Sequence, residues 1–181
     1  GYQASYTGST ANYVTSLGYQ AAYSNTSTNY LVALGAFAGY TFSNGSADNY
    51  ASTYVGTSAG RNNTTSIDNT FIGGSAGRLT TTGSYNTALG SAALYSNTTA
   101  SYNAAFGYQA LYNNTTAGGN NAFGYATLYS NTTGVENVAV GGSSSGLSAL
   151  SSNTTGNYNV AVGTNALGKN TTASNNTAVG Y

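Results

Sequence analysis

A bulky apolar residue followed by glycine recurs along the chain at a nearly constant interval, with polar stretches in between. Counted from Gly1, eight of the ten steps between these glycines are 17 residues long, and the other two are 21 and 22 residues long. A fixed period with an occasional insertion is typical of a solenoid, in which each repeat forms one rung stacked on the last. The structural glycine file consists of Gly18, Gly35, Gly56, Gly73, Gly90, Gly107, Gly124, Gly141, Gly163 and Gly180.

Each repeat reads as a strand, a polar turn and a second strand. The residue before the glycine is bulky and apolar, and the residue before that one is mostly alanine. Because neighbouring residues of a strand point to opposite faces, both faces of this strand are apolar. Alanine can fill the narrow interior of the coil, whereas the other face needs a cover, most simply another copy of the chain. We therefore expect an all-β parallel β-solenoid (β-roll) with 17-residue rungs that forms a homo-oligomer or filament.

The repeats differ in regularity along the chain. Residues 1–68 hold divergent repeats with an insertion near 43–48, and residues 69–181 hold regular repeats with an insertion near 142–146. Extra residues in a solenoid usually bulge outward as a loop on one rung. Both ends cut through a repeat, so we expect them to continue into more chain or to dock against another subunit.

An aromatic file lies five residues after the repeat glycine, and Arg61 and Arg78 occupy the same position in two repeats. Rungs about 4.8 Å apart bring such side chains within stacking distance. A surface aromatic ladder is the favoured interpretation, because a regular stack occupies its own ring faces; a sugar-binding tyrosine stripe is the alternative. The ladder is clearest at Tyr95, Tyr112 and Tyr129.

Asparagine forms two further files, one four residues before the repeat glycine and one seven residues after it. Asparagine tolerates left-handed turns and bonds local backbone, so turn chemistry is the simplest interpretation; bonding between stacked side chains is the alternative. The turns also carry Asn-x-Ser/Thr sequons, which we expect to face solvent where a glycosylation route exists. The candidate glycosylation sites are Asn25, Asn44, Asn62, Asn63, Asn97, Asn113, Asn114, Asn131, Asn153, Asn170 and Asn175.

Composition removes several classes of function. Charged residues make up 3% of the chain, with three cations and three anions, which is too little charge to neutralise nucleic-acid phosphates. No apolar run approaches the roughly 20 residues of a spanning helix, so we expect no membrane insertion by this segment. Histidine and cysteine are absent, which excludes Ser-His-Asp and Cys-His catalysis. We expect neither an enzyme nor a cofactor or metal site.

The motif Asn-x-Ala-Φ-Gly, where Φ is bulky and apolar, carries a resemblance to known proteins. It reads Asn86-Thr-Ala-Leu-Gly90 and Asn137-Val-Ala-Val-Gly141 in two of its copies. This motif resembles the head repeats of trimeric autotransporter adhesins. Gly107–Thr116 is similar to the Gly-Tyr-Gln-Ala-Leu-Tyr repeats of bacterial surface and phage tail-fibre proteins. The adhesin resemblance implies a left-handed, trimeric β-roll that binds host matrix or surfaces, and it assigns no binding residue.

Three functions compete on these grounds. The first is an extracellular structural or adhesive fibre at a cell surface or on a virion, whose partners are itself and a host surface or glycans. The second is the receptor-binding shaft of a phage tail fibre. The third is an ice-binding solenoid, which requires a flat Thr-x-Thr file, whereas Thr98 and Thr99 lie in a turn. We rank the functions in that order.

Overall fold

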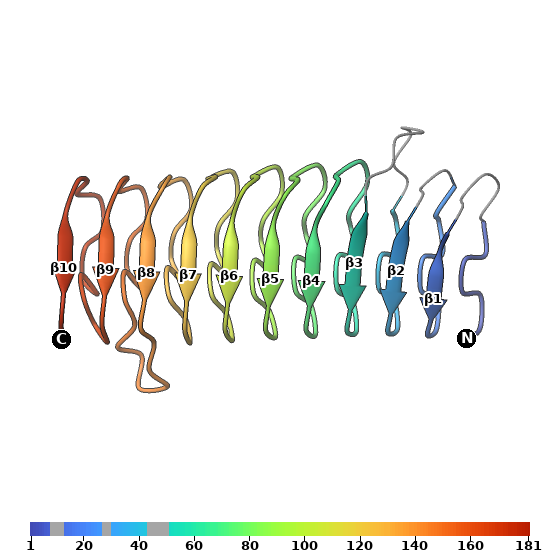
Figure 1. The fold of residues 1–181 in the computed structure, drawn as a ribbon, viewed down its shortest axis with the longest axis horizontal. Helices are drawn as coiled ribbons and strands as arrows, with labels where there is room; N and C mark the ends of the chain where they lie inside the picture. The colour runs from blue at the N-terminus through green and yellow to red at the C-terminus, as the bar shows by residue number, and fades with distance from the viewer. Residues whose placement is uncertain (8–12, 27–29, 43–50) are drawn as a thin grey trace.

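The computed structural model describes residues 1–7, 13–26, 30–42 and 51–181. Within these residues the regular structure is β-strand alone, and ten strands form one parallel sheet in sequence order. Figure 1 shows the strands side by side along the long axis, with the two termini at opposite ends. The fold therefore confirms the predicted parallel β-solenoid. The strands are β1 (Thr15–Leu17), β2 (Leu31–Leu34), β3 (Ser52–Val55), β4 (Thr70–Ile72), β5 (Thr87–Leu89), β6 (Ala104–Phe106), β7 (Asn121–Phe123), β8 (Val138–Val140), β9 (Val160–Val162) and β10 (Thr177–Val179).

The strand register stacks equivalent positions of successive repeats. Ala88 of β5 pairs with Ala105 of β6, and both alanines are fully buried. On the opposite face, Phe106 of β6 pairs with Phe123 of β7, and their ring centroids lie 4.8 Å apart. That distance is the ordinary spacing between neighbouring strands, so each repeat advances the coil by one strand. The alanine column points inward and the bulky column points outward.

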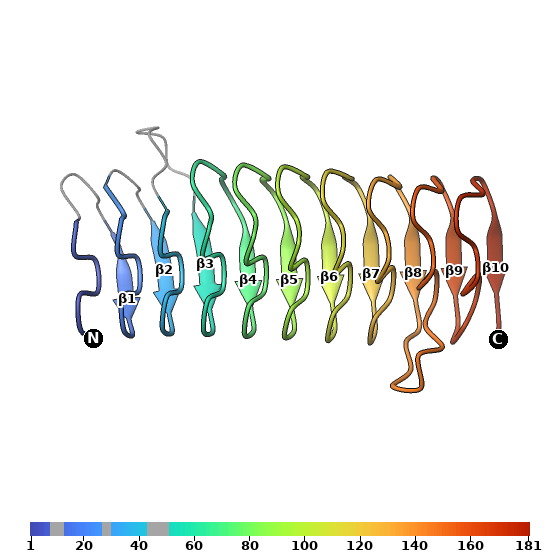
Figure 2. The same cartoon turned by 180° about the vertical axis from the view of Figure 1, so that it is seen from behind.

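The sequence predicts two strands in each rung, but among the described residues each rung has one, which precedes the repeat glycine. The segment after each glycine is irregular instead of extended. In Figure 2, which views the coil from behind, these irregular segments pass in front of the sheet. In the rung that begins at Gly107, Gln109 and Leu111 have left-handed backbone, with φ of 54° and 53°. A chain that is left-handed at alternate residues cannot be an extended strand. It still bonds to the next rung, because the Leu111 N–H donates to the Thr127 carbonyl at 3.0 Å.

The glycine file marks the closest approach between rungs. Gly90 has a φ of 137°, a conformation that L side chains rarely adopt. A Cβ atom placed on Gly90 would lie 2.6 Å from the carbonyl carbon of Gly107 in the next rung. Glycine is therefore required here both by the backbone conformation and by the stacking of the rungs.

The core lies between the sheet and the returning segments. The alanine column of the strands faces a column of small residues three positions after the glycine and a leucine column one position further on. Side chains in this narrow interior are packed closely, as in other protein cores. The fully buried leucines of this column are Leu94, Leu111, Leu128 and Leu150.

The two insertions have different outcomes in the structure. The insertion near 43–48 lies outside the described residues. The insertion near 142–146 forms a loop that projects from the coil next to β8 (Figure 1). After this loop the Ala149 N–H donates to the Gly141 carbonyl at 2.8 Å, the same bond that Ala110 makes to Gly107 in a rung without an insertion. The loop thus adds residues without changing the register of the coil.

Candidate functional site

The outward face of the sheet carries the bulky apolar residues that precede the repeat glycines. Leu89 is 45% exposed and Phe123 is 40% exposed, whereas the alanines between them in the strands are fully buried. A continuous apolar column on the surface of a soluble protein is typical of an interaction surface. The outward apolar column consists of Leu17, Leu34, Val55, Ile72, Leu89, Phe106, Phe123, Val140, Val162 and Val179.

A second outward column runs beside the first, two residues earlier in each strand. Its members are half-buried or exposed, and they are threonine, valine, asparagine and alanine side chains. The face is therefore two side chains wide, without a charged residue at either position. This second column consists of Thr15, Val32, Thr53, Thr70, Thr87, Ala104, Asn121, Val138, Val160 and Thr177.

The aromatic ladder lies on the returning segments. Tyr95 and Tyr112 stack with ring centroids 5.0 Å apart, and Tyr112 and Tyr129 stack at 5.3 Å. The Arg78 guanidinium lies 5.6 Å from the Tyr95 ring, and its Nη1 donates to Tyr95 Oη at 2.8 Å. Partial desolvation and the neighbouring Tyr95 phenol raise the pKa of Tyr112. Because the rings cover one another's faces, this ladder offers little ring surface to a sugar.

The asparagine file before the strands forms a buried ladder, which we call the strand asparagine ladder. In it, the Asn120 Oδ1 accepts the backbone N–H of Asn137 at 3.0 Å, and the Asn120 Nδ2 donates to the Gly134 carbonyl at 2.8 Å. Each side chain thus links its own rung to the next one. The ladder consists of Asn69, Asn86, Asn103, Asn120, Asn137, Asn159 and Asn176.

The file in the turns, which we call the turn asparagine ladder, bonds along the axis as well as locally. The Asn131 Nδ2 donates to Asn114 Oδ1 at 3.0 Å and to the Gly134 carbonyl three residues later at 2.8 Å. The asparagines of this ladder do not themselves have left-handed backbone, which occurs at other positions of the rung, for example at Tyr85 and Leu94. Both interpretations of these files thus hold in part, because each side chain closes its turn and also bonds to its neighbour. The ladder consists of Asn97, Asn114, Asn131, Asn153 and Asn170.

The sequon asparagines correct the expectation that they face solvent. Six of the candidates are at most 1% exposed, because their side chains lie inside the coil. These six are Asn25, Asn63, Asn97, Asn114, Asn131 and Asn153. Asn175 is exposed, Asn62, Asn113 and Asn170 are half-buried, and Asn44 lies outside the described residues. In the folded chain, Asn62, Asn113, Asn170 and Asn175 remain the candidates within reach of a modifying enzyme.

The threonines of the turns are used for inter-rung bonding. The Thr98 Oγ1 donates to the Thr115 carbonyl at 3.1 Å, and the Thr115 Oγ1 donates to the Thr132 carbonyl at 3.1 Å. These hydroxyls are therefore bonded within the protein and do not form a flat outward Thr-x-Thr file. This arrangement argues against ice binding through the turns.

Acidic and basic side chains are sparse across the described part of the chain. No three His, Cys, Asp or Glu residues gather there in a way that could hold a metal ion. Asp68 Oδ1 accepts the backbone N–H of Ala51 at 3.0 Å, and Asp48 lies outside the described residues. Among the residues described, no helix is long and apolar enough to cross a membrane.

Comparison with known proteins adds no family assignment. The chain matches no family model, and no curated protein or solved structure shows significant similarity to it.

Proposed function

We propose that the chain is a segment of an extracellular structural or adhesive fibre, in which copies associate through the outward face of the sheet. The single observation that carries this proposal is the outward apolar column, which runs along all ten strands and whose members are exposed or half-buried in the single chain. The interior of the coil is already filled by the alanine and leucine columns. The outward column is therefore not needed for the core of one rung.

Apolar surface that is covered on association stabilises the assembly roughly in proportion to the area removed from water. The formal net charge of zero means that long-range repulsion does not oppose the approach of two copies. The parallel sheet repeats with the strand spacing, so the outward columns of two copies can meet in register over many rungs. These features support a passive, elongated assembly whose function is length, stiffness and display.

Oligomeric mass tests the association. Light scattering coupled to size exclusion should show a multiple of the 18.2 kDa chain. Phe106→Asp and Val162→Asp place a charge in the outward column, and burying an unpaired charge costs several kcal/mol. Both variants should dissociate while keeping the far-UV circular dichroism of the folded coil. Thr99→Asp, at an exposed turn position, is the matched control and should stay assembled.

Assembly that survives both outward substitutions with unchanged thermal stability would contradict this use of the face. The location of the fibre, on cells or on virions, is tested separately by antibody labelling of the native particle in electron microscopy. The proposal expects label on filaments at a cell surface. Label confined to virions would assign the chain to the shaft of a tail fibre instead.

A further inference from the structure

A notch interrupts a file of exposed residues that immediately precede the strand asparagine ladder. Tyr85 and Tyr102 occupy this position in two successive rungs and stack with centroids 5.1 Å apart. Gly119 takes the position in the next rung, and Glu136 takes it in the rung after that. The φ at Tyr85, Tyr102 and Glu136 is 58°, 63° and 54°, so the backbone continues unchanged past the notch. What is missing at Gly119 is one ring.

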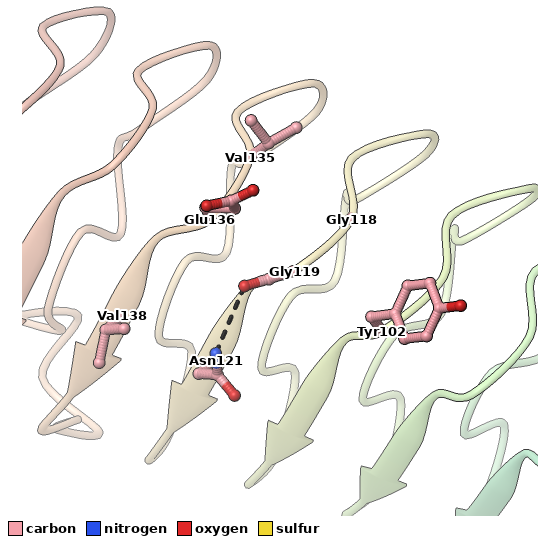
Figure 3. Close-up of a pocket in the computed structure, with 7 residues that line it drawn as sticks. All are labelled: Tyr102, Gly118, Gly119, Asn121, Val135, Glu136 and Val138. Atoms are coloured by element: carbon pink, nitrogen blue, oxygen red, sulfur yellow. Dashed lines mark hydrogen bonds between the residues drawn. The ribbon is translucent and has the colours of Figure 1, made fainter.

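The notch is part of an open hollow of about 710 Å³. Figure 3 shows Tyr102 on one side of it and Glu136 on the other, with Gly119 between them. Two rungs separate Tyr102 from Glu136, which is about 9.6 Å at the usual strand spacing. That span accepts one flat ring stacked on Tyr102. The hollow is lined by Tyr102, Gly118, Gly119, Asn121, Val135, Glu136 and Val138.

Tyr102 offers one open ring face to this notch. Tyr85 covers its other face, yet the Tyr102 side chain is still 66% exposed. By contrast, in the separate aromatic ladder of Tyr95, Tyr112 and Tyr129, each ring stacks on the ring of the next rung. The face of an aromatic ring carries a negative quadrupole that attracts C–H groups, as well as apolar area that favours contact. Tyr102 is thus a platform that the chain leaves without its next ring.

The polar groups around the notch are hydrogen-bond acceptors. Glu136 is the single glutamate of the sequence, it is exposed, and its carboxylate has no partner among the described residues. Its Cγ lies close over Gly119, 3.0 Å from where a Cβ would be. Asn121 Nδ2 donates to the Gly119 carbonyl at 3.3 Å, which turns its Oδ1 away from Gly119 (Figure 3). The notch therefore combines an apolar platform with one acceptor group, the carboxylate of Glu136.

We propose that this notch binds a neutral pyranose ring, with the C–H face of the sugar stacked on Tyr102 and its hydroxyls donating to the carboxylate of Glu136. The ligand is a single ring, about as thick as the tyrosine ring that is missing at Gly119, and it carries several O–H donors. A uronic or sialic acid is disfavoured, because its carboxylate would meet that of Glu136. The site goes beyond the structural role proposed above and does not depend on it.

Saturation-transfer NMR on the assembled protein, with methyl glycosides of neutral hexoses as probes, tests the proposal. Gly119→Tyr restores the missing ring. It should fold because Tyr85 and Tyr102 hold a similar backbone conformation in neighbouring rungs, and because the exposed Glu136 side chain, whose Cγ would lie 3.0 Å from the new Cβ, can turn aside. We expect Gly119→Tyr and Tyr102→Ala each to weaken binding by at least about tenfold. Tyr158→Ala, at an exposed tyrosine of the same file outside the notch, is the matched control and should bind as the unmodified chain does.

The charge of Glu136 gives a second readout that a merely structural role would not change. The unmodified chain should bind a methyl glucoside in preference to the matching glucuronide. Glu136→Gln should remove that preference, because the amide keeps an acceptor but carries no charge. Retention of the preference in Glu136→Gln would overturn the assignment.

Three further results would overturn the proposal. One is the absence of saturation transfer to every neutral glycoside at millimolar concentration. Another is tighter binding of tetramethylammonium than of any glycoside, since the notch would then be a cation site. The last is a change in oligomeric mass on Gly119→Tyr, since the notch would then receive a second copy of the chain. An assembled protein that binds no sugar would refute this site and leave the proposed fibre standing.

Discussion

The ring of Tyr54 fills the space that Gly60 leaves open across the interior of the coil. Tyr54 is fully buried, and a Cβ atom on Gly60 would lie 2.7 Å from its ring carbon Cδ1. In a later rung the sizes are exchanged, because Ala88 stands at the strand position and Leu94 at the opposite one. Both members of each pair are buried, so the rungs conserve interior volume while exchanging which side supplies it.

The pair Phe71 and Gly77 repeats the arrangement of Tyr54 and Gly60, and it allows a test of this exchange. Phe71→Ala alone should destabilise the fold by about 3–5 kcal/mol through the cavity it leaves. Gly77→Leu alone should also destabilise it, because Phe71 occupies the space. The double variant reproduces the pairing of Ala88 with Leu94 on the same left-handed backbone, with φ of 56° at Gly77 and 52° at Leu94.

We therefore expect a favourable coupling of about 2 kcal/mol between the two substitutions in urea unfolding. Phe71→Ala combined with the more distant Leu111→Ala is the control and should show additive losses. Additive losses in the Phe71 and Gly77 pair as well would contradict the exchange.

Loss of one side chain from the strand asparagine ladder should be costly. Asn120→Ala leaves the buried N–H of Asn137 without its partner, and it removes one of the two side-chain amides that donate to the Gly134 carbonyl. The expected loss is about 2–3 kcal/mol in the free energy of unfolding. Asn113→Ala removes a half-buried side chain and should change stability by less than about 0.5 kcal/mol. Equal losses at the two positions would show that the ladder bonds contribute little.

Alkaline pH should destabilise the chain through Tyr54. Burial raises the pKa of this phenol in the folded state, so its contribution is fully present below the unfolded pKa of about 10 and is lost as pH rises above that value. Between pH 9 and pH 11 the Tyr54→Phe variant should therefore lose less stability than the unmodified chain loses, as followed by thermal unfolding. Tyr158→Phe, at an exposed ring, is the control.

At neutral pH, Tyr54→Phe should leave stability unchanged or raise it by about 1 kcal/mol. The Tyr54 hydroxyl is buried without a hydrogen-bond partner among the described residues, and such a group carries a desolvation cost. Phe71 already stands at the equivalent position of the next rung. A clear loss of stability would reveal a hydrogen bond to the phenol.

Substitution of a repeat glycine should disrupt stacking. Gly107 has a φ of 136°, and a Cβ atom there would lie 2.6 Å from the carbonyl carbon of Gly124. Gly107→Ala should cost about 3 kcal/mol or more, since both backbone strain and the rung contact oppose it. Gly74→Ala is the matched control, because the nearest atom to its Cβ is Ser91 Oγ at 3.9 Å. Chemical denaturation of the two variants should separate them clearly.

The sequence by itself determined the repeat, the parallel stacking and the direction of the strand side chains. Period 17 and the Ala-Φ-Gly motif suffice for this, because a residue that recurs once per rung must stack on its equivalents. The outward apolar column could likewise be read from the alternation of faces along residues such as Ala88 and Leu89. The inference that chains associate through it follows from this pattern, and the structure places the column on the surface.

Only the tertiary structure decided the conformation of the returning segments and the direction of the asparagines. Leu94 and Leu111 adopt left-handed backbone that their residue type disfavours, because the narrow coil and its inter-rung hydrogen bonds require it. Asn97 and Asn114 point inward for a similar reason, since their amides satisfy buried groups of the turn. The notch at Gly119 has a signal in the sequence, because a glycine replaces a tyrosine there. Only the structure shows that Tyr102 and Glu136 lie on its two sides.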